Sequence, residues 1–93
     1  MKVRFTPFAL AALDAIFNHI EERNPTAALR VKQRIVTLAE RLGDLPRIGT
    51  RTDLENVRVL VVHPFPYLLF YQISDDTDEV WILDVRHGAR WRR

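Results

Sequence analysis

The chain of 93 residues contains no cysteine, which excludes a disulfide framework, a thiolate zinc site and a cysteine nucleophile. Serine occurs once, at Ser74 beside an acidic turn, and no nucleophile elbow surrounds it, so a serine hydrolase is not expected. The only three glycines form no phosphate-binding loop. No apolar run approaches the length of a membrane span, and the N-terminus has no signal-peptide core. We therefore expect a cytoplasmic protein with no membrane contact.

Metal ligands are also scarce. The three histidines, His19, His63 and His87, have no metal-ligand spacing. The acidic run around Asp75 lacks the glycine and the distal glutamate of a calcium-binding loop, and a solvated hairpin turn is the simpler interpretation. We expect neither a metal nor a cofactor.

What the chain does have is an ordinary globular composition, with 47% hydrophobic and 28% charged residues. A chain of this length forms one domain, which we expect to cover residues 1–93. Twelve of the fourteen basic residues are arginine, which suits bidentate recognition of phosphate or carboxylate, although a codon bias towards arginine would give the same count.

Positive charge is concentrated at the C-terminus. The last eight residues carry +4, so residues 1–85 carry a net −2 against +2 for the whole chain. A strand that ends in such a cluster presents cations at one place and suits an anionic partner. The candidate binding residues there are Arg86, His87, Arg90, Trp91, Arg92 and Arg93.

Two of these residues are candidates for catalysis. His87 lies between Arg86 and Arg90, where it is placed to act as a general base on a ribose hydroxyl while Arg90 holds a phosphate. The alternative is a strand-end histidine that bonds backbone. Trp91 similarly has two interpretations, a stacking or anchoring residue, or a tail aromatic folded back onto the sheet.

The periodicity of the chain predicts a β-α-α-β-β-β order. Thr6-Pro7 and Asn24-Pro25 each pair a helix cap with proline at the first helical position, and Gly43 is the expected stop of the second helix. Apolar residues recur at spacings of three and four through both helices. We expect strands at residues 3–5, 57–62, 67–73 and 79–85, with a loop at 44–56. The three later strands should form an antiparallel meander covered on one face by the helical hairpin, an α+β fold.

Several segments together resemble the ParE/RelE superfamily of toxin–antitoxin toxins over nearly the whole chain. They are the run from Leu45 to Gly49, the arginine-bearing strand through Arg58, the run from Pro66 to Tyr71 and the run from Ile82 to Arg90. The resemblance implies a β-α-α-β-β-β fold with a helical hairpin on a twisted antiparallel sheet. It also makes Arg58 a candidate residue for binding a target or an antitoxin.

The members of this superfamily differ in activity. RelE-like members are metal-independent endoribonucleases that cleave mRNA on the ribosome with basic residues on the sheet, whereas ParE-like members inhibit DNA gyrase and are not established nucleases. Here Val59, Val61 and Leu68 stand where the ribonucleases carry cations, and Trp91 stands near their tail tyrosine. The resemblance therefore favours the ParE-like branch, and enzymatic activity is not the leading expectation.

The resemblance also implies partners. A cognate antitoxin, ParD-like or similar, is expected to neutralise the protein, with DNA gyrase as the expected target and the ribosome and its mRNA as the alternative. Growth inhibition and plasmid stabilisation are the corresponding cellular roles. A third possibility is a degenerate member that binds its antitoxin without being toxic.

Overall fold

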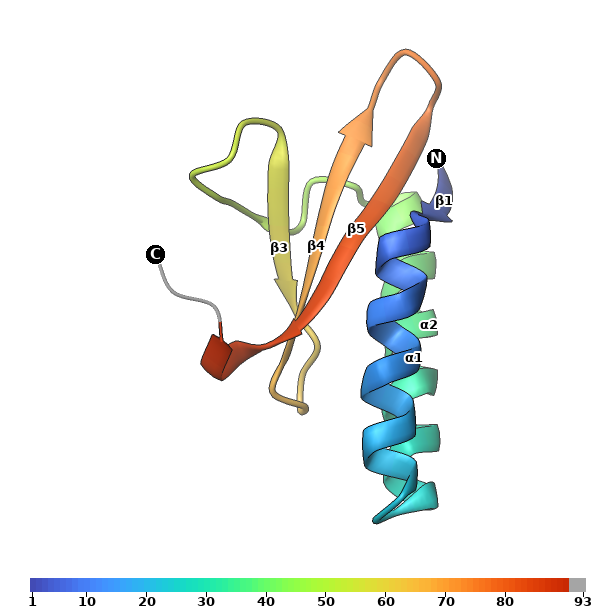
Figure 1. Ribbon diagram of the computed structural model, residues 1–93. Helices are drawn as coiled ribbons and strands as arrows, with labels where there is room; N and C mark the ends of the chain where they lie inside the picture. Colours follow the sequence, from blue (N-terminus) through green and yellow to red (C-terminus); the bar gives the residue numbers. More distant parts are fainter. Residues whose placement is uncertain (91–93) are drawn as a thin grey trace.

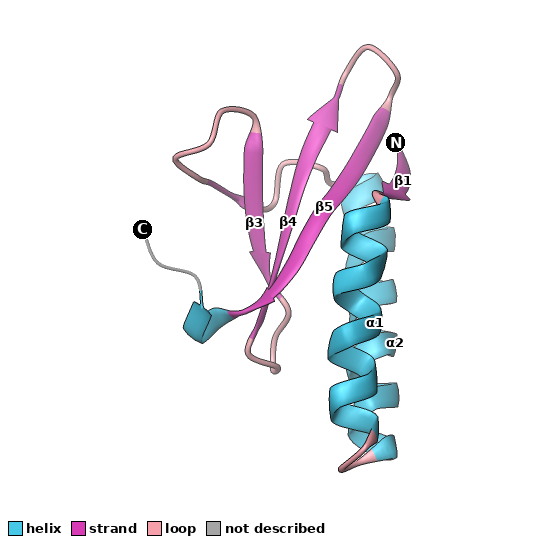
Figure 2. Cartoon of the chain, viewed as in Figure 1, coloured by secondary structure: helices cyan, strands magenta, loops and turns pink. Residues whose placement is uncertain are grey.

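The computed structural model describes residues 1–90. In chain order the elements are β1 (Lys2–Phe5), α1 (Pro7–Glu21), α2 (Pro25–Asp44), β2 (Thr50–Arg51), β3 (Val57–Val61), β4 (Tyr67–Ser74), β5 (Glu79–His87) and a 3₁₀ turn, η1 (Gly88–Arg90). Figures 1 and 2 show α1 and α2 side by side on one side of the sheet, close to β5 and far from β3. The expected α+β fold with a helical hairpin on a sheet is confirmed. Among residues 1–90, no helix has the length and apolar character needed to cross a membrane.

Both helices begin where their caps predict. Thr6 Oγ1 accepts a hydrogen bond from the Ala9 amide at 3.0 Å, and Asn24 Oδ1 accepts one from the Ala27 amide at 3.1 Å. Each cap satisfies an amide that has no partner within its helix, and the proline that follows has no N–H to satisfy. The short link between the two helices makes them an antiparallel hairpin.

The prediction that Gly43 stops the second helix is wrong by a residue, because α2 continues through Gly43 to Asp44. Gly43 instead allows the N-terminus to approach the helix. The Met1 ammonium donates to the Gly43 carbonyl at 2.8 Å, and a Cβ at position 43 would lie 2.8 Å from the Met1 carbonyl oxygen.

The sheet has five strands in the order β1-β5-β4-β3-β2. The three later strands form the expected antiparallel meander, but β1 pairs with β5 in parallel, so the sheet is mixed. The 44–56 segment is not entirely loop, since it contains the end of α2 and the two-residue strand β2. The last strand also runs past the predicted end at Val85 to His87, so Arg86 and His87 are strand residues.

The helix-facing side of the sheet holds the core. Leu69 and Tyr71 on β4, and Val80, Ile82 and Val85 on β5, are buried with apolar residues of both helices. Core residues of a regular strand are two positions apart, but Ile82 and Val85 are three apart. The extra position arises because β5 has an irregularity where its register with Phe70 and Tyr71 shifts. Strict alternation would point Asp84 and Arg86 at the helices; the extra residue returns Val85 to the core and turns that pair outward.

The other side of the sheet carries no helix among residues 1–90, and we call it the open face. Its side chains alternate with those of the core. Apolar members of this face are Val57, Val59, Val61, Leu68, Phe70, Trp81 and Leu83. Apolar residues on both faces of β4 agree with its position as the middle strand.

Candidate functional site

The C-terminal end of β5 carries two of the predicted site residues, and strand alternation separates them. Arg86 is paired in register with Leu68 and faces the open side, whereas His87 is paired with Tyr67 and faces the helices. The sequence predicted one cluster of cations because it placed both residues beyond the strand. In the structure the Arg86 guanidinium lies over Phe70 on the other face, although Arg86 also borders the hollow that His87 lines.

Arg86 lies along the open face. Its guanidinium Nε donates to the Asp84 carboxylate, and its guanidinium carbon lies 5.9 Å from the centre of the Phe70 ring. Asp84 is nearly buried and its other carboxylate oxygen accepts from the Val85 amide at 2.8 Å. The charge of Arg86 is therefore partly compensated within the chain, while its guanidinium covers an aromatic ring.

His87 stands over a hollow of about 500 Å³ between α1 and the end of the sheet, which His19, Ile16 and Tyr67 also line. The imidazole meets the Tyr67 ring edge-on, with ring centres 5.6 Å apart. Its Nδ1 accepts a hydrogen bond from the Ala89 amide at 3.1 Å. A neutral imidazole that accepts at Nδ1 carries its proton on Nε2, so Nε2 is a hydrogen-bond donor.

The open face is the largest feature that the sequence did not assign to a site. Phe70 and Val59 are almost fully covered, and Val61 is 41% exposed. Leu54 from the β2–β3 loop, which lies near Phe70, is 67% exposed. A small hollow of about 150 Å³ lies between Leu54, Phe70 and Leu83. Phe70 is a buried residue of this sheet face, whereas the contribution of Leu54 and Leu83 depends on loop placement and on the β5 irregularity.

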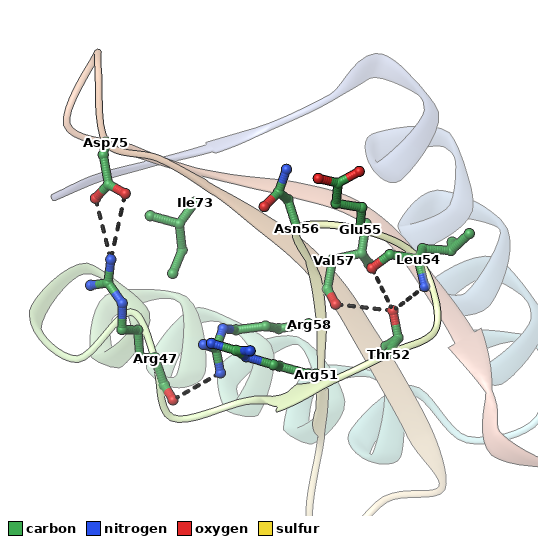
Figure 3. Close-up of a pocket in the computed structure, with 10 residues that line it drawn as sticks. All are labelled: Arg47, Arg51, Thr52, Leu54, Glu55, Asn56, Val57, Arg58, Ile73 and Asp75. Atoms are coloured by element: carbon green, nitrogen blue, oxygen red, sulfur yellow. Dashed lines mark hydrogen bonds and ion pairs between the residues drawn. The ribbon is translucent and has the colours of Figure 1, made fainter.

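Arg58 lies away from both of these places, on the helix-facing side of β3, beyond the part of the sheet that the helices cover. Arg58 lines a hollow of about 420 Å³ with Arg47, Arg51 and Asp75. Figure 3 shows these residues. Arg58 Nη1 donates to the carbonyl oxygens of Gly49 at 2.9 Å and Arg47 at 3.4 Å. The structure therefore joins Arg58 to arginines of the predicted loop and not to the C-terminal cations.

The loop that carries Arg47 is held by Tyr71. The Tyr71 hydroxyl donates to the Pro46 carbonyl at 2.7 Å and accepts from the Gly49 amide at 2.8 Å. Burial raises the pKa of this phenol above its usual value, and the Gly49 hydrogen bond and the charge of Arg58 oppose that rise. A Cβ on Gly49 would lie 2.6 Å from the hydroxyl oxygen, so only glycine fits here.

The remaining predicted residues lie at the chain end. Arg90 closes the 3₁₀ turn, and its side chain is outside the described structure. Trp91, Arg92 and Arg93 also lie outside the described residues. Within residues 1–90, no group of three or more histidine or acidic side chains is placed to hold a metal ion.

Comparison with known families decides which family this geometry belongs to. The model of the family described as ParE toxin of the type II toxin–antitoxin system parDE matches residues 3–91. The chain belongs to the ParE toxin family. It is therefore a type II toxin–antitoxin toxin of the ParE/RelE superfamily, as the resemblance of its motifs suggested.

Similar proteins carry both names of the superfamily. Toxin RelE2 of Caulobacter vibrioides is 39% identical over 89 residues, covering 96% of this ParE-family chain and 97% of that protein. A chain of the chromosomal ParDE toxin–antitoxin system of P. aeruginosa is similar with a TM-score of 0.74 and 27% identity, covering 94% of this chain and 95% of that one. A chain of the RelBE2 toxin–antitoxin complex of Mycobacterium tuberculosis has a TM-score of 0.62 and 28% identity, with 92% and 95% covered.

Proposed function

We propose that this ParE-family chain inhibits DNA gyrase by forming a protein–protein interface with it. We also propose that a ParD-like antitoxin neutralises the chain. Growth inhibition in the cytoplasm follows from blocked replication, and plasmid stabilisation is the corresponding role for a toxin carried on a plasmid. The alternatives are a RelE-like ribosome-dependent endoribonuclease and a member that binds its antitoxin without toxicity.

The apolar open face is the observation that supports gyrase inhibition most. Cleaving a phosphodiester without a metal needs several cations around the developing charge. On the open face of β3, β4 and β5, within the described residues, the only cation is Arg86, and it is bonded to Asp84. Valine, leucine and aromatic side chains suit contact with a protein, because their burial excludes water from an interface.

The geometry of His87 supports the same choice. A general base needs a free lone pair aimed at the proton it removes. The Nδ1 lone pair of His87 is occupied by the Ala89 amide, so the neutral ring offers an N–H at Nε2. This arrangement suits a hydrogen-bond donor in a binding surface better than a base.

The antitoxin is proposed from the relatives and from the shape of the chain. Two of the similar structures are named as toxin–antitoxin systems or complexes. An amphipathic antitoxin segment would fit the hollow between α1 and the end of β5, which Ile16 and Tyr67 line, and acidic residues in that segment would suit the net positive charge of the last eight residues of the sequence. Such an interface should bury more than about 1,200 Å² in total.

Two assays on the purified chain test the proposal: supercoiling by purified gyrase, and mRNA cleavage on translating ribosomes. We expect inhibition of supercoiling and no cleavage. His87→Gln should change supercoiling inhibition little, whereas a ribonuclease that uses His87 for proton transfer should lose on the order of 10²–10⁴ in rate. His19→Gln is the matched control, because His19 lines the same hollow.

Arg90→Ala, and truncation after Arg90, should weaken inhibition while leaving the thermal transition of the chain in place, since both remove cations from beyond the last strand. Ribosomal cleavage that depends on His87 but not on His19 would replace the gyrase proposal with the endoribonuclease. If the chain is inactive in both assays but forms a stable complex with its antitoxin, the third alternative is supported: a family member that binds its antitoxin without being toxic.

A further inference from the structure

Two arginines face each other across the β2–β3 pair. Arg51 and Arg58 are register partners in this antiparallel ladder, so their side chains leave the sheet on the same face. Like charges directly opposite in a ladder are destabilising. Figure 3 shows the two guanidinium groups side by side in the hollow, with Arg47 close to them. Arg51 and Arg58 therefore place two like charges opposite each other, and the third cation, Arg47, is paired with Asp75.

The cluster is built on a fixed frame. The buried Tyr71 hydroxyl ties the Pro46–Gly49 segment to β4, and Arg58 donates to two carbonyl oxygens of that segment. Arg58 is half-buried and uses only Nη1 in these bonds. Arg51 is exposed, and its guanidinium has no hydrogen bond or ion pair within residues 1–90. The site thus has one anchored guanidinium and one whose donors are free.

Internal carboxylates compensate the cluster only in part. Asp75 accepts from Arg47 at 3.4 and 3.5 Å, at the long limit of a hydrogen bond, and both side chains are mostly exposed. Glu55 lines the same hollow, which leaves three cations against two carboxylates. The hollow of about 420 Å³ has room for a further anionic group, and Ile73, which lies on the same face of the sheet as Arg58, gives it an apolar wall.

We propose that Arg47, Arg51 and Arg58 form a binding site for a single carboxylate side chain, an aspartate or glutamate presented by a protein partner. The arginine fork matches a carboxylate bidentately. The apolar side chain of Ile73 suits the methylene groups of such a side chain. A nucleic acid strand is a poorer occupant, because its row of phosphates would meet Asp75 and Glu55 at the rim. The site is distinct from Arg86 and His87 and does not depend on gyrase as the target.

Side-chain NMR of the ¹⁵N-labelled chain tests the site directly. The probe is a blocked peptide that carries a single glutamate, with single-stranded dT₆ and inorganic phosphate as separate titrations. The peptide should shift the Nε–Hε resonances of Arg51 and Arg58, and Arg51→Gln should weaken its fitted affinity roughly 5- to 10-fold. Arg30→Gln on α2 removes the same charge from another element and should change the affinity less than about twofold.

Equal peptide affinity in Arg51→Gln and in the parent would overturn the site. So would tighter binding of dT₆ or of phosphate at the same resonances, which would assign the pocket to phosphate groups. The melting temperature of the free chain gives an independent readout. Arg51→Gln should raise it by roughly 1–3 °C by relieving repulsion, while Arg30→Gln should leave it nearly unchanged. A lower melting temperature for Arg51→Gln would show that its guanidinium already has a stabilising partner.

Discussion

The two faces of the sheet are both apolar, yet only one is covered by the helices. Leu69 and Leu68 are neighbours on β4 and point to opposite sides; Leu69 is fully buried against the helical hairpin, whereas Leu68 is only half-buried on the open face. Apolar surface that a small domain leaves uncovered usually marks an interaction site. The comparison teaches that one strand supplies the core of the domain with alternate residues and a binding surface with the others.

The largest expected effect is on the covered face. Leu69→Ala should lower the free energy of unfolding by about 2–5 kcal/mol, because it leaves a cavity in a core closed by two helices. Urea unfolding followed by circular dichroism measures this. In a domain of this size such a loss unfolds a considerable part of the population. A loss below about 1 kcal/mol would show that the helix-covered face does not hold the stabilising core of the chain.

Gly49→Ala sharpens the comparison at the border of the covered face. The added Cβ would clash with the Tyr71 hydroxyl and ring, which are buried and fixed by two hydrogen bonds. We expect a loss of roughly 1–3 kcal/mol, the usual cost of overpacking. The double variant Gly49→Ala, Tyr71→Phe should recover part of this loss, and additive losses would contradict the clash.

Leu68→Ala tests the open face. The side chain is half-buried and has no helix above it, so we expect a stability loss below about 1 kcal/mol. If the open face binds the target, inhibition of gyrase should weaken by about tenfold or more, as for a residue inside an interface. Titrating the variant in the supercoiling assay measures this, with Leu29→Ala on the exposed surface of α2 as the control. Unchanged inhibition would remove the open face from the binding surface.

Much of the fold was predictable from the sequence, whereas the remaining features depend on where the strands end and how they pair. Cap-and-proline pairs at Thr6 and Asn24 located both helices, because they report local hydrogen bonding. The two-sided apolar pattern of β4 is typical of a central strand, and the sheet places β4 in the middle. The parallel pairing of β1 with β5 was not predictable, because it depends on which edge of the sheet is free after the meander has formed.

The candidate site was predicted less well. The sequence placed Arg86 and His87 in one cluster because it ended the strand at Val85. The strand continues, and the irregularity at Leu83 determines which face each later side chain takes. A single extra residue in a ladder reverses every following side chain, and its position follows from packing rather than from local preference. The Arg47–Arg51–Arg58 pocket was missed for a similar reason, since β2 has only two residues and its register becomes visible only in the folded sheet.

The smallest expected effect concerns the charged margin of the sheet, where Arg4 on β1 bonds the Glu79 carboxylate on β5. The hydrogen bond from Arg4, with a further one from Thr77, lowers the pKa of Glu79 below its usual value of 4.5. Because folding lowers this pKa, the pair stabilises the chain at pH values above the unfolded-state pKa. That stabilisation is lost as the pH falls through the folded-state value.

Glu79→Gln should therefore shift the urea midpoint slightly at about pH 7 and not at all at about pH 2, since an exposed pair contributes little and a protonated one contributes nothing. Glu40→Gln, on the exposed surface of α2, removes the same charge away from this margin and is the control. A difference between parent and Glu79→Gln that persists unchanged at about pH 2 would mean that Glu79 acts through packing and not through its charge. Side-chain packing at this margin would then stabilise the chain, as packing does on the covered face. The two faces of the sheet would differ less in their contribution to stability than the burial of Leu69 and Leu68 indicates.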